Sequence, residues 1–353
     1  MAGQSNMTVY STATLVAVVP NLKRAQKFLL DRFFPGLVLS DTEEVDIDVD
    51  VGKRRLAPFV SPLVEGKLVE GRRYQTNRFK PAYIKDKRAP DLRRPVRRAI
   101  GEKIGGGDLS AQQRYEANLA FEMEDQVDMV DRRLEWMAAQ ALTTGTVTVT
   151  GEGFPTQVIN FGRAASLTVT LSGAAKWGQP GVSPSADIEK WQHEILKKSG
   201  GQANDIVFTV TSWAHFIADE KVSKAVWYPG GGGKENDINI GAQTQRGAVY
   251  KGKWGQYDLW LYNDWYVDPV DDVEKPMVVD GTVIMSGIDL MGTRAFGLIM
   301  DPSFAYAPMA YAPKMWLNQD PAQIFLMMQS APLVIPSRVN ASFAANVCDP
   351  VVN

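Results

Sequence analysis

The chain has 353 residues and a net charge of −2, and its 45% hydrophobic and 22% charged residues exclude a disordered protein. The single cysteine, Cys348, excludes a disulfide framework and fits folding in a reducing cytoplasm. No run approaches the roughly 20 apolar residues of a membrane helix. We expect no signal peptide, because the apolar stretch 15–19 is short and lacks a preceding basic region.

Residues 1–51 are predicted to form an N-terminal arm. The stretch 22–34 predicts a short helix that ends at Pro35-Gly36. Its apolar anchors are Phe28, Leu29, Phe33 and Phe34. Aliphatic residues then alternate with acids over 44–51, which predicts a strand with one buried face. The acidic face is either simply solvated or covered by cations.

Residues 52–107 contain short β-like pieces and many prolines. Within them, residues 63–83 predict a hairpin with its turn at Glu70-Gly71, and residues 85–107 predict an extended, flexible segment. Twelve Lys and Arg residues against three acids give residues 72–103 a net charge of +9, which leaves −11 on the rest of the chain. This segregation indicates either a nucleic-acid arm or self-complementary assembly.

Assembly explains the basic segment better. Proteins that bind single strands interleave aromatic residues for base stacking, but here Tyr74, Phe79 and Tyr83 all lie in the first half of the segment. The prolines favour an extended strap, which would make many weak, screened contacts with a neighbour's acidic strand. The candidate inter-subunit contacts are Asp46, Asp48, Asp50, Arg72, Arg73, Arg78, Phe79, Lys80, Lys85, Lys87 and Arg88.

The clearest helix is predicted over 108–142. Its apolar residues recur in steps of three and four, at Tyr115, Leu119, Met123, Val127, Val130, Leu134, Met137 and Ala141. Ser110 and Gln113 form a capping-box pattern at its start, and Gly145 follows its end. The helix is roughly 50 Å long. It is an ordinary core helix, a coiled-coil strand or the scaffold of an oligomer.

The second half of the chain alternates between strands and helices. Strands are predicted at 146–150, 156–160, 167–171 and 205–211, and helices at 185–198 and 213–226. Residues 247–300 are predicted to be mostly strands, with turns at Gly252, Gly255, Gly281 and Gly292. The last apolar segment, 324–335, is a candidate strand pair interrupted at 330–332.

The sequence carries no recognisable constellation for chemistry. Neither His193 nor His215 has a metal-ligand spacing, and no G-x-S-x-G nucleophile motif occurs. The run 230–234 fails as a phosphate loop, because Tyr228 stands where the first glycine is needed and Glu235 follows the lysine. We therefore expect no catalytic, cofactor-binding or metal-binding residues, and no enzyme.

Abundant aromatic residues leave one other class open. Nine Trp and eleven Tyr residues can build a sugar-binding or glycoside-processing surface, although subunit interfaces also use large aromatics. Glycoside hydrolysis needs two carboxylates across a cleft. Acids on the outer face of the long helix, such as Glu122, Glu124 and Asp125, are expected to be solvated.

Several stretches, in order along nearly the whole chain, resemble the lambda-type major capsid (head) protein family of tailed bacteriophages. They are APFVSPLVEGKLVEG (57–71) with PAYIKDK after it, GEGFPTQVINFGR (151–163), YKGKWGQYDLWLYN (250–263), GTVIMSG and GTRAFGLIMD (281–301), and DPAQIFLMMQSAPLVIP (320–336). None of them is a catalytic motif, so the resemblance lies in their joint order.

The resemblance implies the Hong Kong 97-type shell fold, an α+β architecture. The expected parts are an N-terminal arm (1–51), an extended loop region (52–107), a peripheral domain (108–174) with a spine helix (108–142), an axial α/β domain (175–310) and a return to the peripheral domain (311–353).

The resemblance also implies a function. Such proteins assemble as hexamers and pentamers into an icosahedral procapsid, which expands when double-stranded DNA is packaged without sequence-specific binding. A portal is an implied partner, and a decoration protein is left open. The expected location is the virion, after assembly in the host cytoplasm and without membrane or cofactor. An encapsulin-like protein compartment is the alternative.

Two departures from the fold's other members matter. Some carry a long N-terminal scaffolding segment, whereas only about fifty residues precede the extended loop here, so we expect a separate scaffold protein. Some cross-link a loop lysine to a neighbour's asparagine. No pattern marks such a pair among Lys67, Lys80, Lys85, Asn340 and Asn346, so we expect no cross-link.

Overall fold

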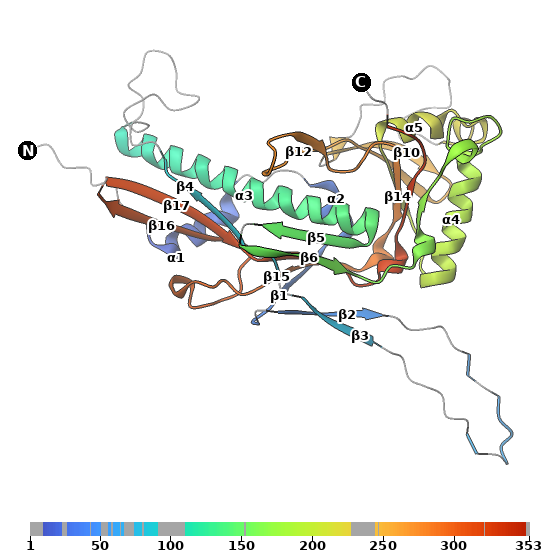
Figure 1. The fold of residues 1–353 in the computed structure, drawn as a ribbon, viewed down its shortest axis with the longest axis horizontal. Helices are drawn as coiled ribbons and strands as arrows, with labels where there is room; N and C mark the ends of the chain where they lie inside the picture. Colours follow the sequence, from blue (N-terminus) through green and yellow to red (C-terminus); the bar gives the residue numbers. More distant parts are fainter. Residues whose placement is uncertain are drawn as a thin grey trace, which may run out of the picture.

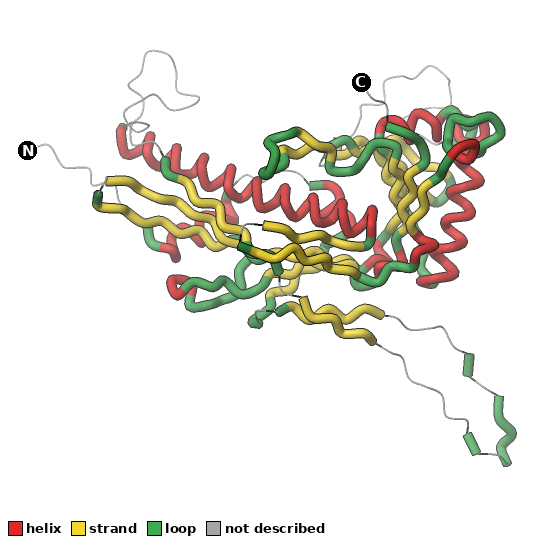
Figure 2. Tube along the Cα trace, viewed as in Figure 1, coloured by secondary structure: helices red, strands yellow, loops and turns green. Residues whose placement is uncertain are grey.

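The computed structural model describes residues 10–22, 27–42, 44–50, 56–57, 59–63, 65–66, 74–79, 81–90, 110–151, 153–226, 244–245, 247–320 and 322–350. The molecule is elongated around one long helix, and a hairpin projects from one of its long sides (Figure 1). A seven-stranded sheet with flanking helices fills one end, and a three-stranded sheet lies toward the other (Figure 2). No helix in these ranges is long and apolar enough to cross a membrane.

The arm contains two short helices. The sequence pattern does not predict α1 (Thr12–Val18), which begins with Ser11 accepting a hydrogen bond from the backbone N–H of Thr14. Helix α2 (Phe28–Phe33) is shorter than the predicted stretch 22–34, because Leu22 and Lys27 are extended. All four predicted anchors are buried, which confirms them. Strand β1 (Gly36–Leu39) follows.

The projecting hairpin pairs strands that are distant in the sequence. Strand β2 (Val45–Asp50) confirms the strand predicted from the alternating acids. It pairs antiparallel with β3 (Tyr74–Phe79). The hairpin predicted within 63–83 is therefore wrong, because its second half pairs with the acidic strand and Leu63 lies in a turn. Its predicted turn at 70–71 lies outside the described residues.

Helix α3 (Ala111–Thr144) confirms the predicted long helix with a shift of a few residues. Ser110 and Gln113 form the expected capping box, and Gly145 ends the helix in the left-handed conformation at φ 72°. All eight predicted apolar positions are buried. Arg163 donates hydrogen bonds to carbonyls of the last turn, where its charge suits the helix dipole. Burial lowers the pKa of Arg163 to about 10.

Sheets cover α3 along its length. The N-terminal half packs on a three-stranded sheet in the order β16 (Ala312–Gln319), β17 (Ala322–Ser330) and β4 (Ile84–Arg88). The C-terminal half packs on the hairpin of β5 (Thr146–Gly151) and β6 (Phe154–Asn160). Strand β4 lies where the sequence predicts a flexible segment, because its backbone finds a partner in β17.

The seven-stranded sheet gathers strands from three parts of the chain. In order these are β7 (Thr168–Thr170), β19 (Phe343–Asn346), β14 (Thr282–Ser286), β8 (Asp205–Phe208), β11 (Tyr257–Tyr262), β10 (Ala248–Trp254) and β9 (Thr244–Gln245). Strand β19 thus lies in this sheet, although residues 311–353 are expected to return to the peripheral domain. The reason is that β14 and β7 flank it on both sides.

Three helices belong to the same end of the molecule. Helix α4 (Pro184–Ser199) confirms the helix predicted at 185–198, and Gly200 ends it at φ 75°. The helix predicted at 213–226 is two helices, α5 (Val210–Ile217) and α6 (Glu220–Ser223), because Asp219 caps the second one. The phosphate-loop candidate at 230–234 lies outside the described residues.

Aromatic residues of the second half fill this core. Trp191 stacks on Trp177 at 5.9 Å and on Phe343 at 5.0 Å between ring centroids, and Phe216 stacks on Trp177 at 6.3 Å. These rings are buried. They therefore stabilise the fold and present no surface on which a sugar could stack.

Two smaller sheets complete the molecule. Strand β1 pairs with β15 (Gly292–Phe296), which pairs with β18 (Pro332–Pro336). The segment 324–335 therefore supplies strands to two sheets and is not a strand pair, because β17 pairs with β16 and β18 with β15. Strands β12 (Trp265–Val267) and β13 (Glu274–Pro276) form a hairpin.

The predicted glycine turns have mixed outcomes. Gly255 and Gly281 have positive φ and lie at turns, as predicted. Gly252 lies at a bulge in β10, so it does not turn the chain. Gly292 begins β15, where a Cβ would lie 2.1 Å from the carbonyl oxygen of Phe33, so this position is a close approach and not a turn.

Candidate subunit interface

The loop between β2 and β3 carries large apolar side chains that the chain itself does not cover. Leu56 and Leu63 are 94% and 95% exposed, and Phe59 is fully exposed. Burying such a side chain is worth about 1.5–3 kcal/mol. The loop projects from the body (Figure 2), so only another molecule can cover these residues. Phe59 and Leu63 lie within the family-like stretch 57–71 and Leu56 directly precedes it, but no sequence pattern marks these three residues as exposed.

The acidic strand and part of the basic segment meet within one chain. The register of β2 and β3 places Asp46 opposite Arg78, Asp48 opposite Thr76 and Asp50 opposite Tyr74. The acidic strand is therefore already paired on one edge by its own chain. Three other candidate contacts, Arg72, Arg73 and Lys80, lie outside the described residues.

The remaining candidate contacts also have partners in their own chain. Phe79 packs against the main core at the base of the hairpin. The Lys87 ammonium lies 4.2 Å from the Phe325 ring centroid, and the Lys85 ammonium lies 5.1 Å from that of Tyr83. These contacts hold β4 and the hairpin base on the body, and a role between subunits stays a prediction.

Arg88 explains why Glu122, which the sequence predicts to be solvated, is buried. Its guanidinium pairs with Glu122 at 3.1 Å and with Asp125 at 2.5 Å. Glu122 is buried beneath this pair, so the expectation that it is solvated is wrong. The cation from β4 provides the partner that a buried carboxylate requires.

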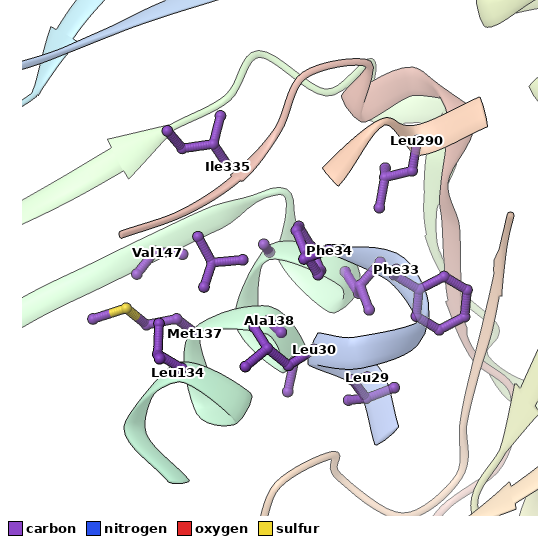
Figure 3. Packing of buried hydrophobic residues seen from close by; sticks show 14 of the residues in the cluster. Leu29, Leu30, Phe33, Phe34, Leu134, Met137, Ala138, Val147, Leu290 and Ile335 are labelled. Carbon is purple, nitrogen blue, oxygen red and sulfur yellow. The ribbon is translucent and has the colours of Figure 1, made fainter. Parts of the chain in front are cut away.

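Helix α2 is held on α3 by a buried carboxylate. Glu135 accepts hydrogen bonds from the backbone N–H groups of Leu29 and Leu30, at 2.9 and 2.8 Å, and from the Tyr262 hydroxyl at 3.0 Å. Burial raises the pKa of Glu135 to about 7. Around these groups, apolar side chains of α2 and α3 interlock (Figure 3). One side chain therefore joins the arm, the long helix and the seven-stranded sheet.

Two arginines tie the same helix to two sheets. Arg294 of β15 donates to the carbonyl oxygen of Phe34 at 2.7 Å and pairs with Asp31 at 2.6 Å. Arg32 of α2 pairs with Asp205 of β8 at 2.8 Å. Strands β1 and β2 directly follow α2 in the chain. The ion pairs of Arg294 and Arg32 therefore fix the position from which the β2–β3 hairpin projects.

These features define a class of protein. In the part of the chain that the structure describes, no group of three or more His, Cys, Asp or Glu side chains is placed to hold a metal. Instead, the molecule presents a loop that projects from the body and carries uncovered apolar side chains. This is the build of a subunit that binds other protein surfaces.

Comparison with known proteins places the chain in a family. The solved putative capsid protein of an E. coli CFT073 prophage has the same fold, with a TM-score of 0.74 at 20% identity, over 97% of this chain and 100% of that one. Residues 11–347 match the family described as phage major capsid protein E, so the chain belongs to this family and is a major capsid protein.

Two relatives agree with this family. The major capsid protein of Escherichia phage N15 is 29% identical and that of Escherichia phage lambda is 28% identical, each over 93% of this chain and 96% of the relative. The family and the α+β capsid fold expected from the sequence are confirmed. Membership in a capsid protein family implies assembly with itself into a shell and a place in the virion.

Proposed function

We propose that this chain assembles as hexamers and pentamers into the icosahedral head of a tailed phage, which encloses double-stranded DNA. The observation that carries the proposal is the projecting loop with Leu56, Phe59 and Leu63 uncovered. A subunit that ends in uncovered apolar surface is completed by its neighbours. It acts by binding them and catalyses no reaction.

The proposed peripheral and axial parts of the subunit are built on different sheets. The peripheral part comprises α3 with β4, β16 and β17, and the axial part is the seven-stranded sheet with α4 and α5. The arm and the extended loop connect a subunit to its neighbours. In a closed ring each subunit offers two different surfaces, because head-to-tail contacts are not self-complementary.

The proposed partners include a separate scaffold and a portal, with assembly in the host cytoplasm. The chain outside residues 72–103 carries a net charge of −11, so DNA contacts are expected to be weak and independent of sequence. An encapsulin-like compartment would enclose protein instead of nucleic acid.

Electron microscopy of the purified protein tests the assembly. Closed shells or ring-shaped capsomers are expected, whereas a compact monomer at high concentration would refute the proposal. Extraction of nucleic acid from particles made during infection then separates a phage head from a protein compartment.

Charge reversal tests the basic strap. Changing Arg72, Arg73 and Arg78 together to Glu should block shell formation and leave a folded monomer, because the reversed charges repel acids of the neighbour. The control changes the same residues to Lys, which keeps the charge and should assemble. Sedimentation separates shells from monomers. If the Glu variant forms shells in normal yield, the strap does not hold neighbours together.

A further inference from the structure

A lysine and an aspartate meet in the interior, where the arm packs on the long helix. Lys27 directly precedes α2, and its ammonium contacts Oδ2 of Asp131 on α3. The two side chains are only 8% and 0% exposed. On the same face of α3, Val127 lies one turn before Asp131 and Leu134 lies about one turn after it, and both are buried. The pair therefore lies where the two apolar cores along the helix adjoin, away from water.

The two carboxylate oxygens of Asp131 have different surroundings. The Tyr311 hydroxyl donates a hydrogen bond to Oδ1. Among the residues that the structure describes, Oδ2 accepts no hydrogen bond, although it touches the Lys27 ammonium. A buried carboxylate is normally stabilised by such bonds to its oxygens. One oxygen of Asp131 is thus held by a donor, and the other lies beside the amine without a hydrogen bond.

Burial favours an uncharged form of this pair. Two charges lose their hydration when they leave water, whereas an amide between the same groups carries no charge. The amide oxygen still accepts the hydrogen bond from Tyr311. Glu135, one turn further along α3, shows that this part of the helix disfavours charge, because burial raises its pKa to about 7. Folding also holds the two groups in contact, and well-placed groups react as if their concentration were about 10⁵–10⁸ M.

We propose that Lys27 and Asp131 condense into an amide bond within one chain, which joins the arm covalently to the long helix. The ammonium first passes a proton to Oδ2, and the neutral amine nitrogen then attacks Cγ of Asp131. Tyr311 stabilises the negative charge that develops on Oδ1. A second proton moves from the nitrogen to Oδ2, the Cγ–Oδ2 bond breaks, and Oδ2 leaves as water with the bonding electrons. Atoms and charges balance without an oxidant or any other reactant.

The bond would act within a single subunit. It holds the start of α2 on α3 even when the hydrogen bonds around Glu135 open, and with it the position from which the β2–β3 hairpin projects. One folded chain contains both residues, so the bond forms before any assembly and the absence of shells would not affect it.

The intact mass of the purified full-length chain tests the bond. After allowance for loss of the N-terminal methionine, the denatured wild-type chain should be lighter than its sequence by the mass of one water molecule. Digestion with trypsin should give a branched peptide in which Lys27 is joined to Asp131. Lys27→Arg is the matched control, because a guanidinium keeps the positive charge and stays protonated, so it cannot attack the carboxyl group. This variant should have its full sequence mass.

Two kinds of result would refute the bond. A wild-type chain at its full sequence mass contains no such amide, and Lys27 and Asp131 are then an ordinary buried ion pair. A missing water that maps to another position, or that is also missing in Lys27→Arg, would equally contradict the proposal. Should Lys27→Arg misfold, the wild-type mass and its peptide map decide the question, because they require no variant.

Discussion

Individual buried charges hold the junction between the arm and the long helix. Asp131 and Glu135 lie on α3 at positions that a solvated helix face would equally allow, yet they are 0% and 1% exposed. Lys27 and Tyr311 bind Asp131, and backbone N–H groups of α2 bind Glu135. Each carboxylate thus has partners that offset the cost of burying it.

The pH dependence of stability tests the role of Glu135. Its pKa rises from 4.5 to about 7 on folding, so the folded chain holds a proton that the unfolded chain releases between these values. The free energy of unfolding should therefore fall as pH rises from about 5 to 8, by at most about 3 kcal/mol. Glu135→Gln has no titratable group at this position, so its free energy of unfolding should lack this part of the decrease with pH.

Urea unfolding of the unassembled subunit at pH 5 and pH 8 measures both proteins. Parallel changes in the wild type and in Glu135→Gln would show that Glu135 does not titrate in this window. Glu135→Ala should be less stable than Glu135→Gln at both pH values, because two buried N–H groups lose their acceptor at about 1–3 kcal/mol each.

At the scale of elements, α3 connects two hydrophobic cores. Leu119 packs in the core shared with α1, β16 and β17, whereas Leu134 packs in the core shared with α2 and β18. The helix presents one continuous buried stripe to both. Its opposite face leaves Phe121 and Met129 about half exposed.

Placing a charge on this stripe should prevent folding. Leu119→Asp and Leu134→Asp each bury an unpaired carboxylate, at a cost of several kcal/mol, on the order of the total stability. Phe121→Asp is the matched control on the same helix, and it should leave a folded monomer since this side chain is half exposed. Soluble yield and circular dichroism measure the result. A cooperative, wild-type-like unfolding transition for Leu134→Asp would contradict the buried position.

At the scale of the whole molecule, two long sides have different chemistry. One side projects a loop with exposed apolar side chains, and the other carries strand β12 (Figure 1). Subunits with two unlike sides build rings and shells by repetition. The asparagines considered for a covalent bond are both partly buried: Asn340 accepts a hydrogen bond from the Ala164 backbone at 2.9 Å, and Asn346 lies in β19 between two strands.

Mature particles should therefore hold no cross-links between subunits. Denaturing gel electrophoresis of purified particles should give a single band near the 38.9 kDa of the monomer. A ladder of multiples would contradict this expectation and would point to one of the loop lysines. Lys85→Arg then tests the described candidate, because arginine keeps the charge of the side chain but not its primary amine.

The sequence by itself determined the local features of this protein. The eight apolar positions of α3, its capping box, Gly145 and the anchors of α2 follow from spacing within one or two helical turns. The family-like stretches likewise identified the class of protein. Such patterns are visible because the interacting residues are near one another in the chain.

The tertiary structure alone decided which distant segments meet. It pairs β2 with β3, sends β17 and β18 into separate sheets, and places β19 in the seven-stranded sheet. Strand pairing and charge burial depend on partners far away in sequence, so no local pattern encodes them. The same holds for the interface: the basic segment suggests that subunits bind there, but only the fold leaves Leu56, Phe59 and Leu63 uncovered on the projecting loop.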